Sequence, residues 1–204
     1  MNDQSFLMQY RKHEIMKRRN IYFMLFIFTL CLLIVIQYYR GHDEKIADTD
    51  NPVMYEKKDI RFLYPGNWKI TEDKEDTEGG FSHHVFIESP GNATFIIQIF
   101  PNLDTIPLQQ FAEQFSKLTQ QKGYPRINNS VFSELEESIN STNNYSIQEN
   151  FSLKVGGQSP HIRRYYSITN NKRIVYLISQ TAKEDLPKVN AGFALILASF
   201  NLTK

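Results

Sequence analysis

The hydrophobic positions of this chain follow three different patterns. Residues 21–39, IYFMLFIFTLCLLIVIQYY, form an apolar run without a charge. In the shorter segments 94–100 and 173–181, both alternating sets of side chains are largely apolar. Residues 105–123, and the segment from about Lys183 onward, place apolar residues three and four positions apart. These patterns predict, in turn, a membrane span, two buried strands and two amphipathic helices.

Residues 21–39 are long enough to cross a membrane as one helix. A helix of 19 residues reaches about 28 Å, which is close to the hydrocarbon thickness of a bilayer. A cleaved signal peptide is the main alternative, but its apolar part is normally about 7–15 residues long and precedes small residues. Here the run ends in Gln37-Tyr38-Tyr39-Arg40. We therefore expect an uncleaved signal anchor in the lipid bilayer.

Charge decides the orientation of this anchor. The first 20 residues carry five Lys or Arg against two acidic residues, and three of the basic residues adjoin the apolar run. Basic residues stay on the cytoplasmic side of a span. We expect a single-pass protein of the inner (plasma) membrane with a cytoplasmic segment at 1–20, a transmembrane helix at 21–39, a linker at 40–52 and an extracytoplasmic domain at 53–204.

Beyond the linker, the chain alternates between strand and helix patterns. Pro-Gly-Asn turns at 65–67 and 90–92 separate strands, and Gly-Gly at 156–157 is placed to join two later ones. The acidic stretch 71–80 contains two glycines and indicates a loop. The expected strands are Asp59–Pro65, Trp68–Glu72, His84–Glu88, Thr94–Phe100 and segments near 130–137, 145–155, 160–169 and 173–181.

Two amphipathic helices complete the domain. Their apolar faces carry Leu108, Phe111, Ala112, Phe115 and Leu118 in the first, and Val189, Phe193, Ile196, Leu197 and Phe200 in the second. The two central strands are apolar on both sides, so both faces of the sheet need a cover. One helix for each face predicts an α/β (α+β) fold, namely a three-layer α/β/α sandwich with a mostly antiparallel central sheet.

The order of these motifs resembles the PsbP-like family. Phe62, Tyr64, Pro65 and Trp68 form the element F-x-Y-P-x-x-W, and the segments FIIQIF, LQQFAEQF and ILASF follow it in order. The resemblance covers about residues 53–203 and implies the fold shared by the extrinsic photosystem II subunit and DcrB-like bacterial envelope proteins. It also implies an accessory role in a membrane complex. The chain departs from those bacterial relatives, often lipoproteins or soluble, in its expected membrane helix.

Trp68 is the only tryptophan, and it directly follows a Pro-Gly-Asn turn. Pro65 and Gly66 suit the centre of a type II turn, which needs glycine at its positive-φ position. Such a turn directs Trp68 back onto Phe62 and Tyr64, so we expect a packing anchor. The alternative is a partly exposed Trp68 at the rim of a partner-binding surface.

No nucleotide-binding loop, HExxH, GxSxG or paired CxxC motif occurs in the chain. His83 and His84 are strand neighbours, so their side chains point to opposite faces and do not bind one ion. A run of five carboxylates lacks the spacing of a calcium loop and fits a solvated loop: Glu72, Asp73, Glu75, Asp76 and Glu78. We expect no catalytic residue, no cofactor and no metal.

One strand face gathers a basic and aromatic set. His161, Arg163 and Tyr165 share this face, because alternate side chains of a strand point the same way. A solvent-facing patch of this kind is a candidate surface for a protein partner. The competing interpretation is ordinary pairing of the arginine with neighbouring acids.

Together these observations favour a membrane-anchored accessory or assembly factor that binds protein partners in the cell envelope and is not an enzyme. Residues 41–204 carry 17 basic and 20 acidic residues, which gives no support to nucleic-acid binding. One alternative is a small-ligand or enzymatic domain with a groove between sheet and helix, which a polar pocket containing His161, Arg163 or Glu88 would favour. Another is a mitochondrial inner-membrane complex subunit with the same topology.

Overall fold

The structure is a computed structural model that describes residues 46–58, 60–76, 82–102, 106–121, 127–139, 142–154, 158–170 and 172–202. Residues Lys45–Lys204 form one compact unit. The segment expected to be cytoplasmic at 1–20, the anchor expected at 21–39 and the turn expected at Gly156-Gly157 lie outside the described residues. Within the described ranges, no helix is long and apolar enough to span a membrane.

Ten strands and two helices follow one another in the described part of the chain. The order is β1 (Val53–Lys57), β2 (Ile60–Tyr64), β3 (Lys69–Asp76), β4 (Ser82–Glu88), β5 (Thr94–Pro101), α2 (Leu108–Gln121), β6 (Ile127–Ile139), β7 (Thr142–Lys154), β8 (Gln158–Thr169), β9 (Arg173–Ala182), α3 (Leu186–Ser199) and β10 (Asn201–Leu202).

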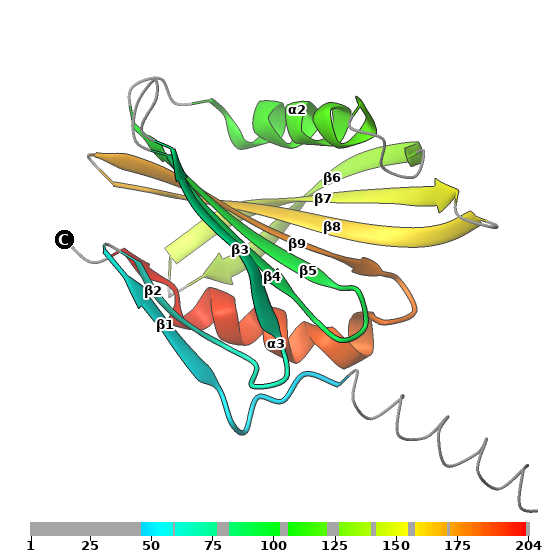
Figure 1. Cartoon of the computed structure of the whole chain (residues 1–204). Helices are drawn as coiled ribbons and strands as arrows, with labels where there is room; N and C mark the ends of the chain where they lie inside the picture. The colour runs from blue at the N-terminus through cyan, green and yellow to red at the C-terminus, as the bar shows by residue number, and fades with distance from the viewer. Residues whose placement is uncertain are drawn as a thin grey trace, which may run out of the picture. The chain divides into compact units, whose positions relative to one another are not determined.

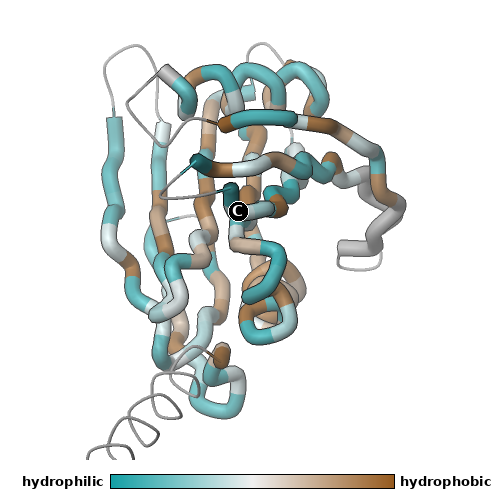
Figure 2. The backbone as a smooth tube through the Cα atoms, turned by 90° about the vertical axis from the view of Figure 1, so that its right-hand side faces the viewer, coloured by the Kyte–Doolittle hydropathy of each residue, from teal (hydrophilic) through white to brown (hydrophobic). Residues whose placement is uncertain are grey.

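Seven of these strands form the central sheet, in the order β3-β4-β5-β9-β8-β7-β6, and the pairs between neighbours are antiparallel. Helix α2 covers one face of the sheet and α3 covers the other (Figure 1). The strands carry hydrophobic positions along their length (Figure 2). The expected α+β sandwich with an antiparallel central sheet is therefore confirmed.

Each face of the sheet has its own apolar core. On the α3 side, Val189, Phe193 and Ile196 pack with β-strand residues such as Phe95 and Leu177. On the α2 side, the core is smaller and rests on aromatic contacts: Phe111 stacks on Tyr176 with ring centroids 3.6 Å apart. The doubly apolar pattern of β5 and β9 thus corresponds to two separate cores.

A second, three-stranded sheet, β1-β2-β10, was not expected from the sequence. It lies on the α3 side of the molecule, where Ile60 and Phe62 of β2 join the α3 core. The expected loop at 71–80 is also wrong in its first half, because Glu72–Asp76 belong to β3 and pair with β4. Lysine and histidine partners, described below, offset the charges that made this stretch look like a loop.

The linker expected at 40–52 is not a free tether from residue 46 onward. Ala47 is buried, and its N–H donates to the carbonyl of Lys188 at 3.0 Å. Asp48 accepts from the N–H of Gly66 at 2.9 Å. The domain boundary therefore lies before residue 46 and not at residue 53.

The turn before Trp68 differs from the expected type II turn. The N–H of Trp68 donates to the carbonyl of Pro65 at 3.0 Å, which places Gly66 and Asn67, and not Pro65 and Gly66, at its centre. Gly66 is required by space: a Cβ here would lie 2.3 Å from the carbonyl oxygen of Asn51. The close approach of residues 46–52 therefore explains this glycine.

Trp68 is 3% exposed and belongs to the α3 core. Its ring meets Phe193 edge-on, with centroids 5.4 Å apart, and Phe62 and Tyr64 belong to the same core. Gly192 leaves room for the indole, since a Cβ there would lie 2.7 Å from Trp68 Cζ2. Trp68 therefore anchors α3 to the turn that precedes β3.

Candidate functional site

A cleft of about 770 Å³ lies between α2 and the face of the sheet that α2 only partly covers. Its floor comes from β4, β5, β8 and β9, and its wall from α2 and the residues just before the helix. The lining residues are Phe86, Glu88, Thr94, Ile96, Gln98, Phe100, Pro101, Ile106, Phe111, Gln114, Phe115, Leu118, Thr119, Ile127, Leu153, Arg163, Ile174, Tyr176 and Gln180.

One end of the floor is polar. Glu88, Thr94, Gln180 and Arg163 lie side by side on four neighbouring strands, because the antiparallel register pairs each with the next. Residues at paired positions project from the same face of a sheet. The sheet topology therefore gathers four polar side chains from four different strands into one row.

The rest of the cleft is mainly apolar. Beyond Thr94, the floor continues along β5 with Ile96 and Phe100. Ile174 and Tyr176 continue it along β9. Leu118 of α2, expected in the core, is 54% exposed and forms part of the wall. An exposed leucine beside the half-buried Phe86 and Phe100 leaves apolar surface available to a ligand.

A buried carboxylate stands behind the polar end. Glu149 on β7 is fully buried and accepts four hydrogen bonds. Ser116 and Ser130 each donate to Oε1 at 2.6 Å, while Tyr165 and Arg163 donate to Oε2 at 2.6 and 2.9 Å. Full coordination of this kind is what a buried charge requires.

Arg163 connects this carboxylate to the cleft. It is 2% exposed, and its guanidinium lies over the rings of Phe115 and Phe151 at 5.2 and 4.8 Å. Nε donates to Gln180 at 2.7 Å, and Nη1 donates to Glu149 and Tyr165. Within the described part of the chain, Nη2 makes no hydrogen bond, and the residue lines the cleft.

Tyr165 is held as a neutral phenol. Burial raises the pKa of Tyr165 far above its ordinary value, and the nearby Glu149 carboxylate adds to this effect although Arg163 opposes it. The hydroxyl therefore serves as a donor to Glu149. The distance of 2.6 Å between the Tyr165 hydroxyl and Oε2 of Glu149 agrees with a hydrogen bond to a charged acceptor.

The expectation that His161, Arg163 and Tyr165 form a solvent-facing patch is wrong, because these side chains are not exposed. Arg163 and Tyr165 are buried beneath α2, and His161 is half-buried, stacked on Phe151 and absent from the cleft lining. The three residues do share one strand face. Helix α2 covers that face, so the competing interpretation, pairing of the arginine with an acid, describes Arg163.

Sequence reasoning missed Glu149, Thr94 and Gln180. Each is a polar residue within a strand, and none belongs to a motif. Their relation to Arg163 depends on the register of five strands, which the sequence does not state. Arg163 and Glu88 were singled out, and the structure places both in the cleft lining.

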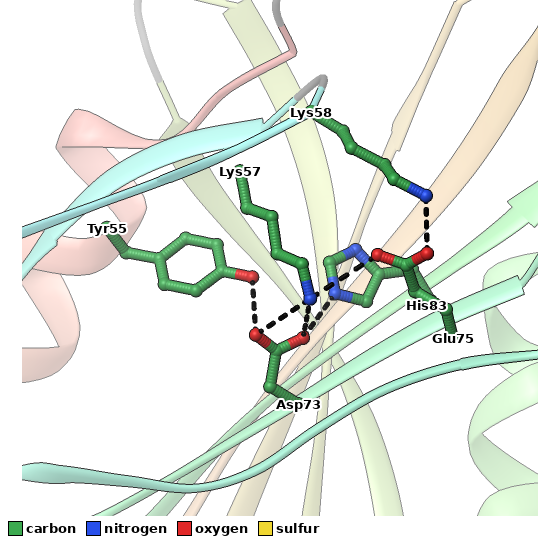
Figure 3. A network of polar contacts seen from close by, with 6 residues as sticks. All are labelled: Tyr55, Lys57, Lys58, Asp73, Glu75 and His83. Carbon is green, nitrogen blue, oxygen red and sulfur yellow. Dashed lines mark hydrogen bonds and ion pairs between the residues drawn. The ribbon is translucent and has the colours of Figure 1, made fainter.

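A second polar cluster joins the β1–β2 hairpin to the edge of the central sheet (Figure 3). Asp73 on β3 accepts from Tyr55 at 3.2 Å and from Lys57 at 3.0 Å, and its Oδ1 lies 2.8 Å from Nε2 of buried His83. Glu75 pairs with Lys57 and Lys58. These contacts hold the two sheets together.

The carboxylates of this cluster are stabilised in their charged form. Burial raises the pKa of Asp73, but hydrogen bonds from His83 and Lys57 outweigh it and leave the pKa below its usual value. A hydrogen bond from Lys58 is the main cause of the lowered pKa of Glu75. Asp73 and Glu75 are thus structural partners of lysines in a strand and not members of a solvated loop.

The two adjacent histidines serve different faces of the sheet. His83 contacts Asp73 on the hairpin side, while His84 meets Phe100 edge-on, with ring centroids 5.7 Å apart. Burial lowers the pKa of His84, and the neighbouring His83 adds to this shift. Among the residues that the structure describes, no group of three or more His, Cys, Asp or Glu is placed to hold a metal ion.

The domain is similar in structure to several solved proteins of low sequence identity. No protein-family model and no curated protein sequence matches the chain. Cyanobacterial PsbP (CyanoP) from Synechocystis sp. PCC 6803 is 17% identical, with a TM-score of 0.48 over 74% of this chain and 92% of that one. LpqN of Mycobacterium tuberculosis, described as involved in cell envelope biogenesis, is 12% identical, with a TM-score of 0.42 over 76% and 90%.

The third is PA94 from Pseudomonas aeruginosa, described as a putative regulator of unknown function. It is 12% identical, with a TM-score of 0.35 over 70% of this chain and 91% of that one. These likenesses are of fold only. A PsbP, from the family that the sequence resembles, is among these similar structures.

Proposed function

We propose that this chain is a membrane-anchored, non-catalytic accessory protein of the cell envelope, and that its domain binds a largely apolar ligand in the cleft beneath α2. The carrying observation is the cleft itself. Its volume of about 770 Å³ lies within the roughly 300–1,000 Å³ of typical ligand sites. Mainly apolar walls with a few gathered polar groups are the usual composition of such sites.

The charged groups of the lining support binding rather than catalysis. Arg163 is already tied to Glu149, and Glu88 lies two strands away from Gln180, the residue that pairs with Arg163. A nucleophile that is activated by a neighbouring base needs the two side chains within hydrogen-bond reach of each other. Within the described lining, Arg163 and Glu88 do not form such a pair.

A fluorescent apolar probe tests this function. N-phenyl-1-naphthylamine is titrated into the fragment 45–204, which contains both apolar cores. We expect saturable binding that Leu118→Gln weakens roughly fivefold, because the leucine side chain loses its apolar contact with the probe. Val131→Gln is the matched control, since Val131 is also exposed but does not line the cleft. Equal binding by both variants, or no saturable binding, would contradict the proposal.

A protein partner is the second candidate, and one observation favours it. Strand β1 is an edge of the three-stranded sheet and exposes Val53 and Met54, which are 40% and 56% exposed. Exposed apolar edge strands accept a strand from another chain. Purification of the full chain in mild detergent should then recover a stoichiometric partner that Met54→Lys releases. Recovery of the chain alone would remove this candidate.

A further inference from the structure

Arg163 gives the cleft its positive group, and in isolation it would attract an anionic ligand. Its charge is already balanced, because Glu149 lies 2.9 Å away and the two side chains are 3% and 0% exposed. An ion pair in such a buried place is weakly screened by solvent. The polar end of the cleft therefore presents a dipole to a ligand and not a net positive charge.

The negative partner is also fixed in place. Glu149 is held by Ser116 from α2, by Ser130 from β6 and by Tyr165 from β8 in addition to Arg163. Displacing it would break bonds to three elements and leave a buried carboxylate without partners, which is costly. A ligand carboxylate or phosphate thus cannot replace Glu149 on Arg163 at low cost.

Glu88 makes the surroundings more negative. It lines the cleft in the same row as Arg163 and is exposed. The lining and its buried partner thus hold one positive group, Arg163, and two negative groups, Glu88 and Glu149. An anionic head group would be repelled more than it is attracted.

Hydrogen-bond donors remain at this end. Within the described residues, neither Nη2 of Arg163 nor the amide nitrogen of Gln180 donates to the protein, while Gln180 Oε1 is occupied by Arg163 Nε. Both residues line the cleft. Two free donors beside each other suit an uncharged oxygen such as a hydroxyl, ester or amide carbonyl.

The apolar floor extends from this polar row in one direction. Along β5 it runs from Thr94 through Ile96 and the single amide of Gln98 to Phe100, a distance of about 20 Å at roughly 3.3 Å per residue. Phe111, Phe115 and Leu118 of α2 follow it as a wall. A groove with one polar end and a long apolar remainder matches a molecule with one polar head and one apolar chain.

From these steps we propose that the cleft selects a single-chain amphiphile with an uncharged, oxygen-bearing head group, and that the Arg163–Glu149 pair excludes anionic head groups. The proposal rests on the proposed function, because it names the ligand class of the same cleft. The head oxygen accepts from Arg163 and Gln180, and the chain lies on Ile96, Phe100 and Ile174. No covalent step is involved.

Displacement of the bound N-phenyl-1-naphthylamine by three ligands with the same chain tests the proposal: 1-decanol, decanoate and decylammonium. All are used below their aggregation concentrations, with the fragment 45–204. We expect 1-decanol to bind at least tenfold more tightly than decanoate. Glu149→Gln frees the charge of Arg163, so decanoate should gain at least tenfold relative to 1-decanol in that variant.

The outcomes separate this proposal from the proposed function. Probe binding that Leu118→Gln weakens establishes the cleft as a binding site, whatever the head-group order. Decanoate binding as tightly as 1-decanol would overturn the selectivity, and so would tight decylammonium binding that Glu88→Gln abolishes. Displacement by apolar peptides alone would also overturn it. If Glu149→Gln shows no cooperative thermal transition by circular dichroism, the ligand order in the unsubstituted domain decides.

Discussion

Trp68 shows how one side chain can join three segments of a fold. A Cβ on Gly192 would lie 2.7 Å from Trp68, 2.8 Å from Pro65 and 3.0 Å from Ala47, so the indole, the turn at Pro65 and the segment before β1 meet at this point of α3. Among the residues that the structure describes, the buried indole N–H has no hydrogen-bond partner. The position is therefore held by shape and apolar contact.

Replacement of Trp68 by alanine should lower the free energy of unfolding of the fragment 45–204 by about 3–5 kcal/mol, because large aromatic-to-alanine changes leave a cavity in the core. A urea titration followed by circular dichroism measures this change. Val131→Ala is the control, with an expected effect within about 0.5 kcal/mol, since Val131 is 62% exposed. An unchanged midpoint in Trp68→Ala would show that the indole does not support the core.

At the scale of elements, the sequence predicts what depends on local periodicity. The two helices and the strands from β4 to β9 follow from apolar spacing, and the doubly apolar β5 and β9 predict the two covers. The sequence does not predict β1 or the acidic part of β3, because their charged residues are typical of loops. In the structure, Lys57 of β1 pairs with the carboxylates of β3. This pairing joins residues that are far apart in the sequence, so local periodicity does not predict it.

The contact between these two elements should depend on pH through Asp73. Its folded-state pKa is lowered, so its contribution to stability is present above its unfolded pKa of about 3.9 and is lost as the pH falls through the lower folded value. Asp73→Asn should therefore destabilise the domain at pH 7, and the difference from the unsubstituted domain should shrink towards pH 3. Urea titrations at several pH values measure it.

Glu72→Gln is the matched control for this prediction. Glu72 is on the same strand, but its contact is with Lys74, and these side chains are 43% and 72% exposed. Exposed pairs contribute little, so this variant should track the unsubstituted domain across the pH range. A difference for Asp73→Asn that does not depend on pH would contradict the account of the cluster.

At the scale of the whole molecule, the cleft is the feature that the sequence could not supply. The sequence indicates Arg163 and Glu88 as candidate pocket residues, but it predicts a buried Leu118 and gives no indication of a role for Glu149. The cleft lies between α2, which contacts β7 and β8, and the half-buried or exposed residues of β4 and β5. The placement of a helix across a sheet depends on side-chain packing and not on periodicity.

The topology of the chain is a prediction at this scale. Residues 1–20 should be cytoplasmic and the domain extracytoplasmic, because of the basic residues before the apolar run at 21–39. A fusion after residue 60 to an enzyme that is active only outside the cytoplasm should be active. Activity of a cytoplasm-dependent reporter at the same position would overturn the orientation, and a mature N-terminus beyond residue 36 would show cleavage.

The central claim is that the cleft beneath α2 binds an apolar ligand, and nuclear Overhauser effects between a bound ligand and labelled methyl groups test it most directly. With 1-decanol and the methyl-labelled fragment 45–204, the account predicts contacts from the decyl chain to Ile96, Leu118 and Ile174, which all line the cleft. Contacts confined to Val53 and Met54 on the exposed edge strand β1, or no contacts at saturating ligand, would contradict it.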